Sequence, residues 1–208
     1  MQKSSLSIFI GLLIIQLSVS YYNKTFILTD DVYRLIVGTQ MSDRQFADYL
    51  QFVQKWQWLS YLFIPLAILM RISFTWACLK AGSFIVEQFE DTSFWFLSVR
   101  AEIVFTAGAL AGLLYTEFFL DLESVEQLSV NPFSMQAMLS SIAPTWSNYL
   151  LNTLNIFELC YILILAYLIA EDSKKKFLPS LKFVASSYLP GLVLWILLVS
   201  YLSIIFQP

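Results

Sequence analysis

Long apolar stretches separated by polar connections dominate the pattern of this sequence. Five of them approach the ~20 residues that a helix needs to cross the hydrocarbon core of a bilayer. They cover about residues 6–20, 59–79, 94–120, 149–170 and 183–206. The pattern predicts an all-α fold, a polytopic membrane helix bundle with about five transmembrane helices. Since these stretches take up most of the chain, we expect residues 1–208 to form a single integral membrane domain.

The connection 21–55 carries a helical pattern that leads into the second stretch. The sequence SDRQ at 42–45 is a capping box, with Ser42 as the N-cap and Gln45 at the third helical position. Apolar residues then recur at helical spacing up to the interfacial aromatics Trp56 and Trp58. We therefore expect one helix to run from this extracytoplasmic loop straight into the second span.

The connection 121–148 contains a second, shorter helical pattern. Asn131 can cap a helix with Pro132 at its first position, and Pro144 ends it. About a dozen residues are too few to span the hydrocarbon core. This length favours an interfacial or re-entrant helix on the outer face.

The first stretch allows two interpretations. Lys3 provides a basic start, residues 6–17 provide an apolar core, and residues 18–20 read Ser-Val-Ser, a small-x-small pattern. These features are shared by cleaved signal peptides and by retained signal anchors. We expect a retained signal-anchor helix, with the cleaved signal peptide as the alternative.

The distribution of basic residues predicts the orientation. The connection after the fourth stretch holds Lys174, Lys175, Lys176 and Lys182, whereas 121–148 has no Lys or Arg. Because short cytoplasmic loops are enriched in Lys and Arg, the first connection is expected in the cytoplasm and the second outside. With five spans, the N-terminus is then cytoplasmic and the C-terminus external. We expect the chain in the cytoplasmic (inner) membrane of a bacterial cell.

The composition agrees with a membrane location and narrows the chemistry. Hydrophobic residues make up 58% of the chain and charged residues 13%, whereas a soluble domain carries about 25% charged residues. The absence of histidine from the sequence removes the usual general base and the commonest metal and haem ligand. Cys78 and Cys160 fall outside any metal-binding spacing. We expect no cofactor, no metal site and no nucleic-acid partner.

Polar residues inside the predicted spans are the candidates for a site. A charged side chain at membrane depth costs about 2.5–3.5 kcal/mol on insertion scales, so it needs a partner. In the fourth span a polar set recurs every three or four residues: Asn148, Asn152, Asn155 and Glu158. On a continuous helix this set forms one stripe. Counted from the outer helix ends, Arg71 and Glu158 lie at similar depths, which predicts an Arg71–Glu158 pair between the second and fourth spans.

Arg100 and Glu102 lie nearer the predicted cytoplasmic edge, where they can satisfy each other or reach water. The predicted intramembrane network therefore contains Arg71, Arg100, Glu102, Asn152, Asn155 and Glu158. Glu117 lies near the outer end of the third span, where water can reach it. With Glu117 left aside, two arginines against two carboxylates leave no net charge in the bilayer, which favours a structural network that fixes helix register. The alternative is a proton or cation site at Glu158, with the asparagines lining its path.

Two glycine features bear on helix packing. Gly108 and Gly112 form a GxxxG sequence in the third span, which lets another helix approach closely. We interpret it as a packing surface inside this protein. Pro190-Gly191 in the last span is expected to kink or loosen that helix.

Two short motifs carry a family resemblance. The Asn131-Pro132-Phe133 turn and the run LNIFEL at 154–159 are similar to the central part of bacterial Yip-like membrane proteins. The resemblance covers the second to fifth spans. It implies five spans with the N-terminus inside and the C-terminus outside, and a non-enzymatic role. It supplies no catalytic residues.

Three classes of function are compatible with these patterns. The favoured one is a non-enzymatic accessory, assembly or scaffold subunit of a larger membrane complex, whose partners are the lipid bilayer and other membrane subunits or further copies of the chain. The alternative is a transporter or channel component that uses the polar stripe around Glu158. An intramembrane enzyme is the third class, and no catalytic motif in the sequence indicates one.

Overall fold

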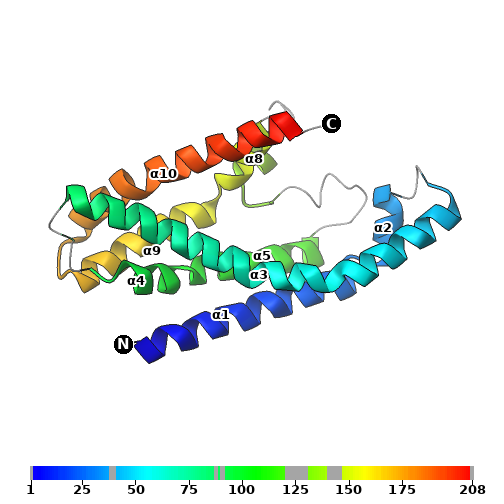
Figure 1. Cartoon of the computed structure of the whole chain (residues 1–208), viewed down its shortest axis with the longest axis horizontal. Coiled ribbons are helices and arrows are strands. Elements are labelled where there is room, and N and C mark those ends of the chain that lie inside the picture. Colours follow the sequence, from blue (N-terminus) through cyan, green and yellow to red (C-terminus); the bar gives the residue numbers. More distant parts are fainter. Residues whose placement is uncertain are drawn as a thin grey trace.

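The computed structural model describes residues 2–37, 41–86, 89, 92–119, 131–139 and 147–206. Within them the regular structure is helical, which confirms the predicted all-α class (Figure 1). The elements are α1 (Gln2–Tyr22), the π-helical turn η1 (Asn23–Ile27), α2 (Asp30–Val37), α3 (Asp43–Ile85), α4 (Phe94–Ala101), α5 (Ile103–Phe119), α7 (Met135–Leu139), α8 (Asn148–Thr153), α9 (Ile156–Asp172) and α10 (Phe177–Phe206).

Among the described residues, four helical segments are long and apolar enough to cross a membrane. They are Ser5–Ile27, Asp43–Ile85, Phe94–Phe119 and Phe177–Ser203. They correspond to four of the five predicted spans, and a membrane location fits them. The remaining predicted span, the fourth at 149–170, is not one helix: it is divided at Leu154 and Asn155 into α8 and the 17-residue α9.

Helix α3 begins at the predicted capping box. The Ser42 side chain accepts a hydrogen bond from the Gln45 backbone N–H, and the Gln45 side chain accepts one from the Ser42 N–H at 3.0 Å. This confirms the predicted helix start and its continuation into the second span. The 43 residues of α3 extend about 65 Å at 1.5 Å per residue, about twice the ~30 Å hydrocarbon core. Part of α3 therefore lies beyond the core, or the helix is strongly tilted.

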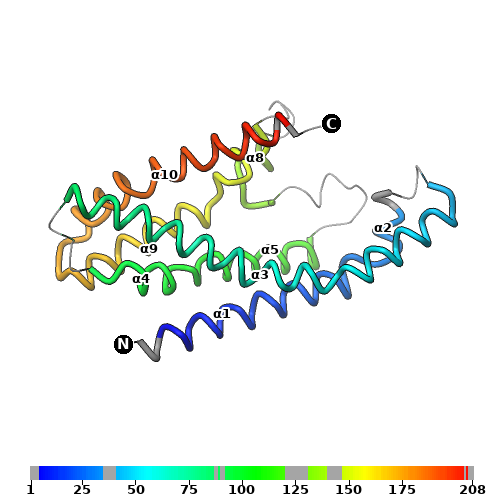
Figure 2. The backbone as a smooth tube through the Cα atoms, viewed as in Figure 1, coloured from blue at the N-terminus to red at the C-terminus, as the bar shows by residue number. Residues whose placement is uncertain are grey.

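Helix α2 and residues 43–55 of α3 form what we call the projection, which extends past the other helices (Figure 2). Arg34 of α2 forms an ion pair with Asp43 at 2.7 Å and lies 5.5 Å over the Phe46 ring. Tyr33 and Tyr49 meet edge to face with ring centroids 6.5 Å apart. Phe46 is buried here, so the projection has a small core of its own.

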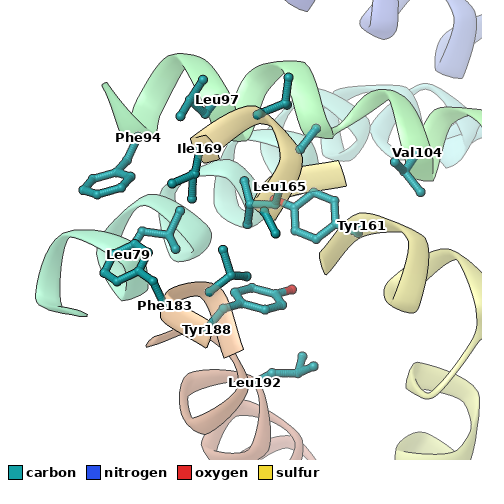
Figure 3. Packing of buried hydrophobic residues seen from close by; sticks show 14 of the residues in the cluster. Leu79, Phe94, Leu97, Val104, Tyr161, Leu165, Ile169, Phe183, Tyr188 and Leu192 are labelled. Atoms are coloured by element: carbon teal, nitrogen blue, oxygen red, sulfur yellow. The ribbon is translucent and has the colours of Figure 1, made fainter. Parts of the chain in front are cut away.

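Helix α9 lies in the middle of the bundle, packed against α4, α5 and α10. Its Tyr161, Leu165 and Ile169 are fully buried. Figure 3 shows them between side chains of three other helices: Leu79 of α3, Phe94 and Leu97 of α4, and Phe183, Tyr188 and Leu192 of α10. Although α9 is short, it contributes as many residues to this core cluster as the longer α10, because neighbouring helices cover it.

Small residues let α3 and α10 approach closely. A Cβ atom at Gly82 of α3 would collide with the Ser187 hydroxyl, and one at Gly191 of α10 would collide with the Cys78 sulfur. Cys78 and Gly82 are four residues apart, as are Ser187 and Gly191, so two small-xxx-small faces meet. Helix α10 continues through Pro190, and the expected loosening is replaced by this tight contact.

The predicted GxxxG face is divided in the structure. A Cβ atom at Gly108 would lie 2.9 Å from Cγ of Phe157 in α9, whereas no atom of the described residues lies within 4 Å of one at Gly112. Gly108 therefore packs inside the protein against α9. Among the residues that the structure describes, Gly112 has no such neighbour.

Candidate functional site

The break between α8 and α9 is organised by one amide side chain. The Asn155 Oδ1 accepts the Glu158 backbone N–H at 2.9 Å, which makes Asn155 the N-cap of α9. Its Nδ2 donates to the carbonyls of Asn152 at 3.2 Å and Thr153 at 3.1 Å. One side chain thus satisfies backbone groups at the end of α8 and at the start of α9, and the predicted continuous polar stripe is replaced by a capped break.

A second segment completes the backbone pairing at this break. The Met135 N–H donates to the Leu154 carbonyl at 2.9 Å, and the Ile156 N–H donates to the Phe133 carbonyl at 3.2 Å. Ser134 and Asn155 thereby form an isolated antiparallel bridge. Residues 131–139 begin as a turn around Asn131, and α7 starts at Met135 and not at Pro132 as predicted. The end expected at Pro144 lies outside the described residues.

Arg71 and Glu102 form an ion pair inside the bundle. The Arg71 Nη1 donates to the Glu102 Oε1 at 2.9 Å. The Glu102 side chain is fully buried, and its Oε2 has no hydrogen-bond partner among the described residues. The guanidinium also lies 4.2 Å from the centroid of the Phe105 ring. This pair joins α3 to the junction between α4 and α5.

Glu158 has a different partner from the one predicted. The Tyr188 hydroxyl of α10 donates to the Glu158 Oε1 at 2.7 Å. Glu158 is buried, in the first turn of α9. The predicted direct Arg71–Glu158 ion pair is thus not the one the structure forms, because α3 packs along α4 and α10 and Arg71 meets the carboxylate of Glu102 first.

The other residues of the predicted network and stripe, Arg100, Asn152 and Asn148, take no part in these two contacts. Arg100 is exposed on α4, and the buried Glu102 that it was expected to satisfy pairs with Arg71 instead. Asn152 lies in α8, and its Oδ1 is buried without a hydrogen-bond partner among the described residues. Asn148 is the first residue of α8. The break at Leu154 separates both asparagines from the helix that carries Glu158.

A cavity of about 720 Å³ brings the polar groups together. Its wall comes from α3, α8, α9 and α10, with Phe105 of α5. The polar residues in the wall are Arg71, Ser73, Tyr149, Thr153, Asn155, Glu158 and Tyr188. The apolar ones are Leu66, Ala67, Leu69, Met70, Phe74, Phe105, Leu192 and Trp195. A largely apolar cavity with a few convergent polar groups has the form of a small-molecule site.

Several residues of the site were not predicted from the sequence. Tyr188 is the hydrogen-bond partner of Glu158, and Tyr161 donates to the Thr75 hydroxyl at 2.9 Å in the buried core. Trp195 donates to the Tyr149 hydroxyl at 3.0 Å. The signal available in the sequence was a tyrosine within an apolar span, since a buried tyrosine hydroxyl needs a partner.

Comparison of this chain with protein-family models, with curated proteins and with solved structures finds no match. The resemblance to Yip-like proteins therefore rests on the two short sequence motifs alone. The contact between residues 133–135 and 154–156 nevertheless shows that the two motifs on which it was based lie side by side in the fold.

Proposed function

We propose that this protein is a non-enzymatic, membrane-integral accessory or assembly subunit of a larger membrane complex. The observation that carries the proposal is the projection. It has its own ion pair and aromatic core, and it extends beyond the rest of the bundle (Figure 1). On its α3 side the Phe52 side chain is 62% exposed, an aromatic anchor of the kind that is enriched where proteins bind one another.

The proposed arrangement in the membrane has five passes, with α8 and α9 together as the fourth. The start of α1 and the end of α10 lie at opposite ends of the bundle, as an odd number of passes requires (Figure 1). The basic connection at 174–176 lies at the same end as the start of α1. By the positive-inside rule, this end is cytoplasmic and the projection is external, in a bacterial inner membrane.

Site-specific photocrosslinking tests the accessory role. A photoreactive phenylalanine analogue at Phe52 is expected to join the chain to a different membrane protein that also co-purifies in stoichiometric amount. The matched control carries the analogue at Leu198, which is 51% exposed on α10, and is expected to give no such adduct. A homo-oligomer with no stoichiometric partner, or equal crosslinking from both positions, would contradict the proposal.

A transporter or channel component is the second candidate, and the cavity beside Glu158 favours it. An ionisable side chain inside the membrane by default suggests a path for protons, ions or substrate. Among the described residues the Glu158 carboxyl group accepts one hydrogen bond, from Tyr188, and Glu158 lines the cavity together with Asn155. In this proposal the carboxylate exchanges its proton or counterion with the cavity.

Proton flux into liposomes that contain the purified chain tests this candidate. Glu158→Gln is expected to abolish flux that the unaltered protein supports. Glu117→Gln is the control, since Glu117 is an exposed carboxylate on α5 and does not line the cavity. Flux that persists in Glu158→Gln excludes a role for this carboxylate in proton transport.

A further inference from the structure

The wall of the cavity is rich in aromatic rings. Phe74, Phe105, Tyr188 and Trp195 all line it, together with Tyr149. Phe74 contacts Tyr188 edge to face with centroids 6.2 Å apart, and its ring lies 5.7 Å from that of Trp195. The rings therefore hold one another in place. The faces of such rings attract organic cations, and this attraction strengthens when the site is shielded from water.

One cationic side chain of the protein already lies against an aromatic ring of the wall. The Arg71 guanidinium lies 4.2 Å from the Phe105 centroid. Its charge is balanced by Glu102, which accepts its hydrogen bond at 2.9 Å and lies outside the cavity wall. With Arg71 compensated in this way, the second carboxylate, that of Glu158, has no cationic partner within ion-pair distance among the described residues.

The charges around the cavity are therefore unequal. One guanidinium, that of Arg71, stands against two carboxyl groups, so the ionised form of Glu158 has no counter-charge of its own. A buried carboxylate that lacks a counterion is costly in a low-dielectric setting. A monovalent cation in the cavity would remove this cost, and an anion would increase it.

The apolar side of the cavity determines what kind of cation fits. Leu66, Leu69 and Met70 of α3 line the cavity and are 50%, 40% and 53% exposed, respectively. With α3 in the membrane, these side chains face the bilayer, so an apolar ligand can reach the cavity from the lipid. A volume of about 720 Å³ is within the range of drug-sized ligands.

From these observations we infer that the cavity binds a lipophilic organic cation, with its charge beside Glu158 and its apolar groups against Phe74, Trp195 and Leu192. The inference names the ligand class for the site of the second candidate function and rests on that site. None of the observations behind it involves the projection. Binding involves no chemical step, because the ligand exchanges between bilayer and cavity as an intact cation.

The test uses tetraphenylphosphonium as the probe and tetraphenylborate, which has nearly the same shape and the opposite charge, as the matched control. Binding of each is measured by equilibrium dialysis of the full chain in nanodiscs of zwitterionic phosphatidylcholine, with empty nanodiscs subtracted. We expect saturable binding of the phosphonium, one per chain, and at least tenfold weaker binding of the borate.

Variants locate the binding to the cavity. Glu158→Gln keeps an oxygen acceptor for Tyr188 and is expected to weaken phosphonium binding at least tenfold, whereas Glu117→Gln changes it less than twofold. Phe74→Leu is expected to weaken binding about three- to tenfold through the lost ring. Phe118→Leu, which removes a 71% exposed ring on α5 outside the cavity, leaves it unchanged.

Three results would overturn the inference. They are the absence of saturable phosphonium binding, unchanged binding in a folded Glu158→Gln protein, and tighter binding of the borate that is lost in Arg71→Gln, which would mark an anion site. The outcome is separable from transport. Phosphonium binding without proton flux retains the inference and rules out proton transport, whereas flux without binding rules out the inference alone.

Discussion

At the scale of single residues, the Arg71–Glu102 pair predicts a strong dependence of stability on both partners. Loss of one partner leaves a buried charge uncompensated. We expect Arg71→Gln to lower the free energy of unfolding by about 2–4 kcal/mol, somewhat less than the ~3–5 kcal/mol for a fully buried pair, because the Arg71 side chain is 37% exposed. Thermal unfolding in detergent micelles measures the change.

The double variant Arg71→Gln/Glu102→Gln removes both charges and is expected to regain most of that loss. Arg100→Gln, a matched change at an exposed arginine, is expected to stay within about 0.5 kcal/mol of the unaltered protein. Equal loss in Arg71→Gln and Arg100→Gln would show that the pair has no special role. A double variant as unstable as the single one would show that packing of the arginine stem matters more than charge.

The sequence identified the ionisable residues of the site but not their pairing. Arg71, Glu102 and Glu158 are each conspicuous as charges within apolar stretches. Depth was counted from the ends of the stretches, and this places Arg71 level with Glu158. Which helix lies next to α3 is set by packing between distant parts of the chain, so counting could not show that Glu102 is the nearer carboxylate.

At the scale of secondary-structure elements, the two glycines of the third span make a matched pair. Gly108→Ala is expected to cost roughly 1–3 kcal/mol, because the added methyl group overpacks against the Phe157 ring. Gly112→Ala meets open space and is expected to be neutral or to stabilise α5 by up to about 1 kcal/mol through helix propensity.

Thermal unfolding of the two variants, measured side by side, checks whether Gly108→Ala lowers the stability while Gly112→Ala does not. Both substitutions add the same methyl group to the same helix, so propensity cancels between them and the Phe157 contact is what distinguishes them. Similar melting temperatures for the two variants would mean that Phe157 moves aside freely. Oligomerisation lost only in Gly112→Ala would instead assign the open glycine to an interface between chains.

The sequence predicts some elements better than others. A signal within a few consecutive residues can be recognised, whereas a contact between distant residues cannot. The start of α3 was predicted because the capping box lies within four consecutive residues. The break between α8 and α9 was missed because LNIFEL is apolar enough to continue a helix. Its free backbone groups are satisfied by Asn155 and by residues 133–135, about 20 residues upstream, and single-sequence periodicity contains no information on that contact.

At the scale of the whole molecule, the proposed orientation predicts which ends of the bundle are accessible. In a background with Cys78 and Cys160 replaced by alanine, Gln51→Cys in the projection is expected to react with an impermeant maleimide on intact cells. Lys174→Cys, in the basic connection, is expected to react only after permeabilisation. The reverse pattern would invert the topology, and labelling of both positions in intact cells would rule out their placement on opposite sides.

Helix α3 joins the projection to the cavity, and Pro65 lies between them. Proline lacks a backbone N–H, so the Tyr61 carbonyl loses its usual helical partner and the helix bends most readily there. On one side of this hinge the Lys24 ammonium fixes α3 through Ser60 and the Gln57 carbonyl. On the other side, within two turns, Arg71 lines the cavity. We therefore expect a partner that displaces the projection to bend α3 at Pro65 and to shift Arg71 in the cavity wall. Since such coupling is reciprocal, a ligand in the cavity is expected to change the affinity of the projection for its partner.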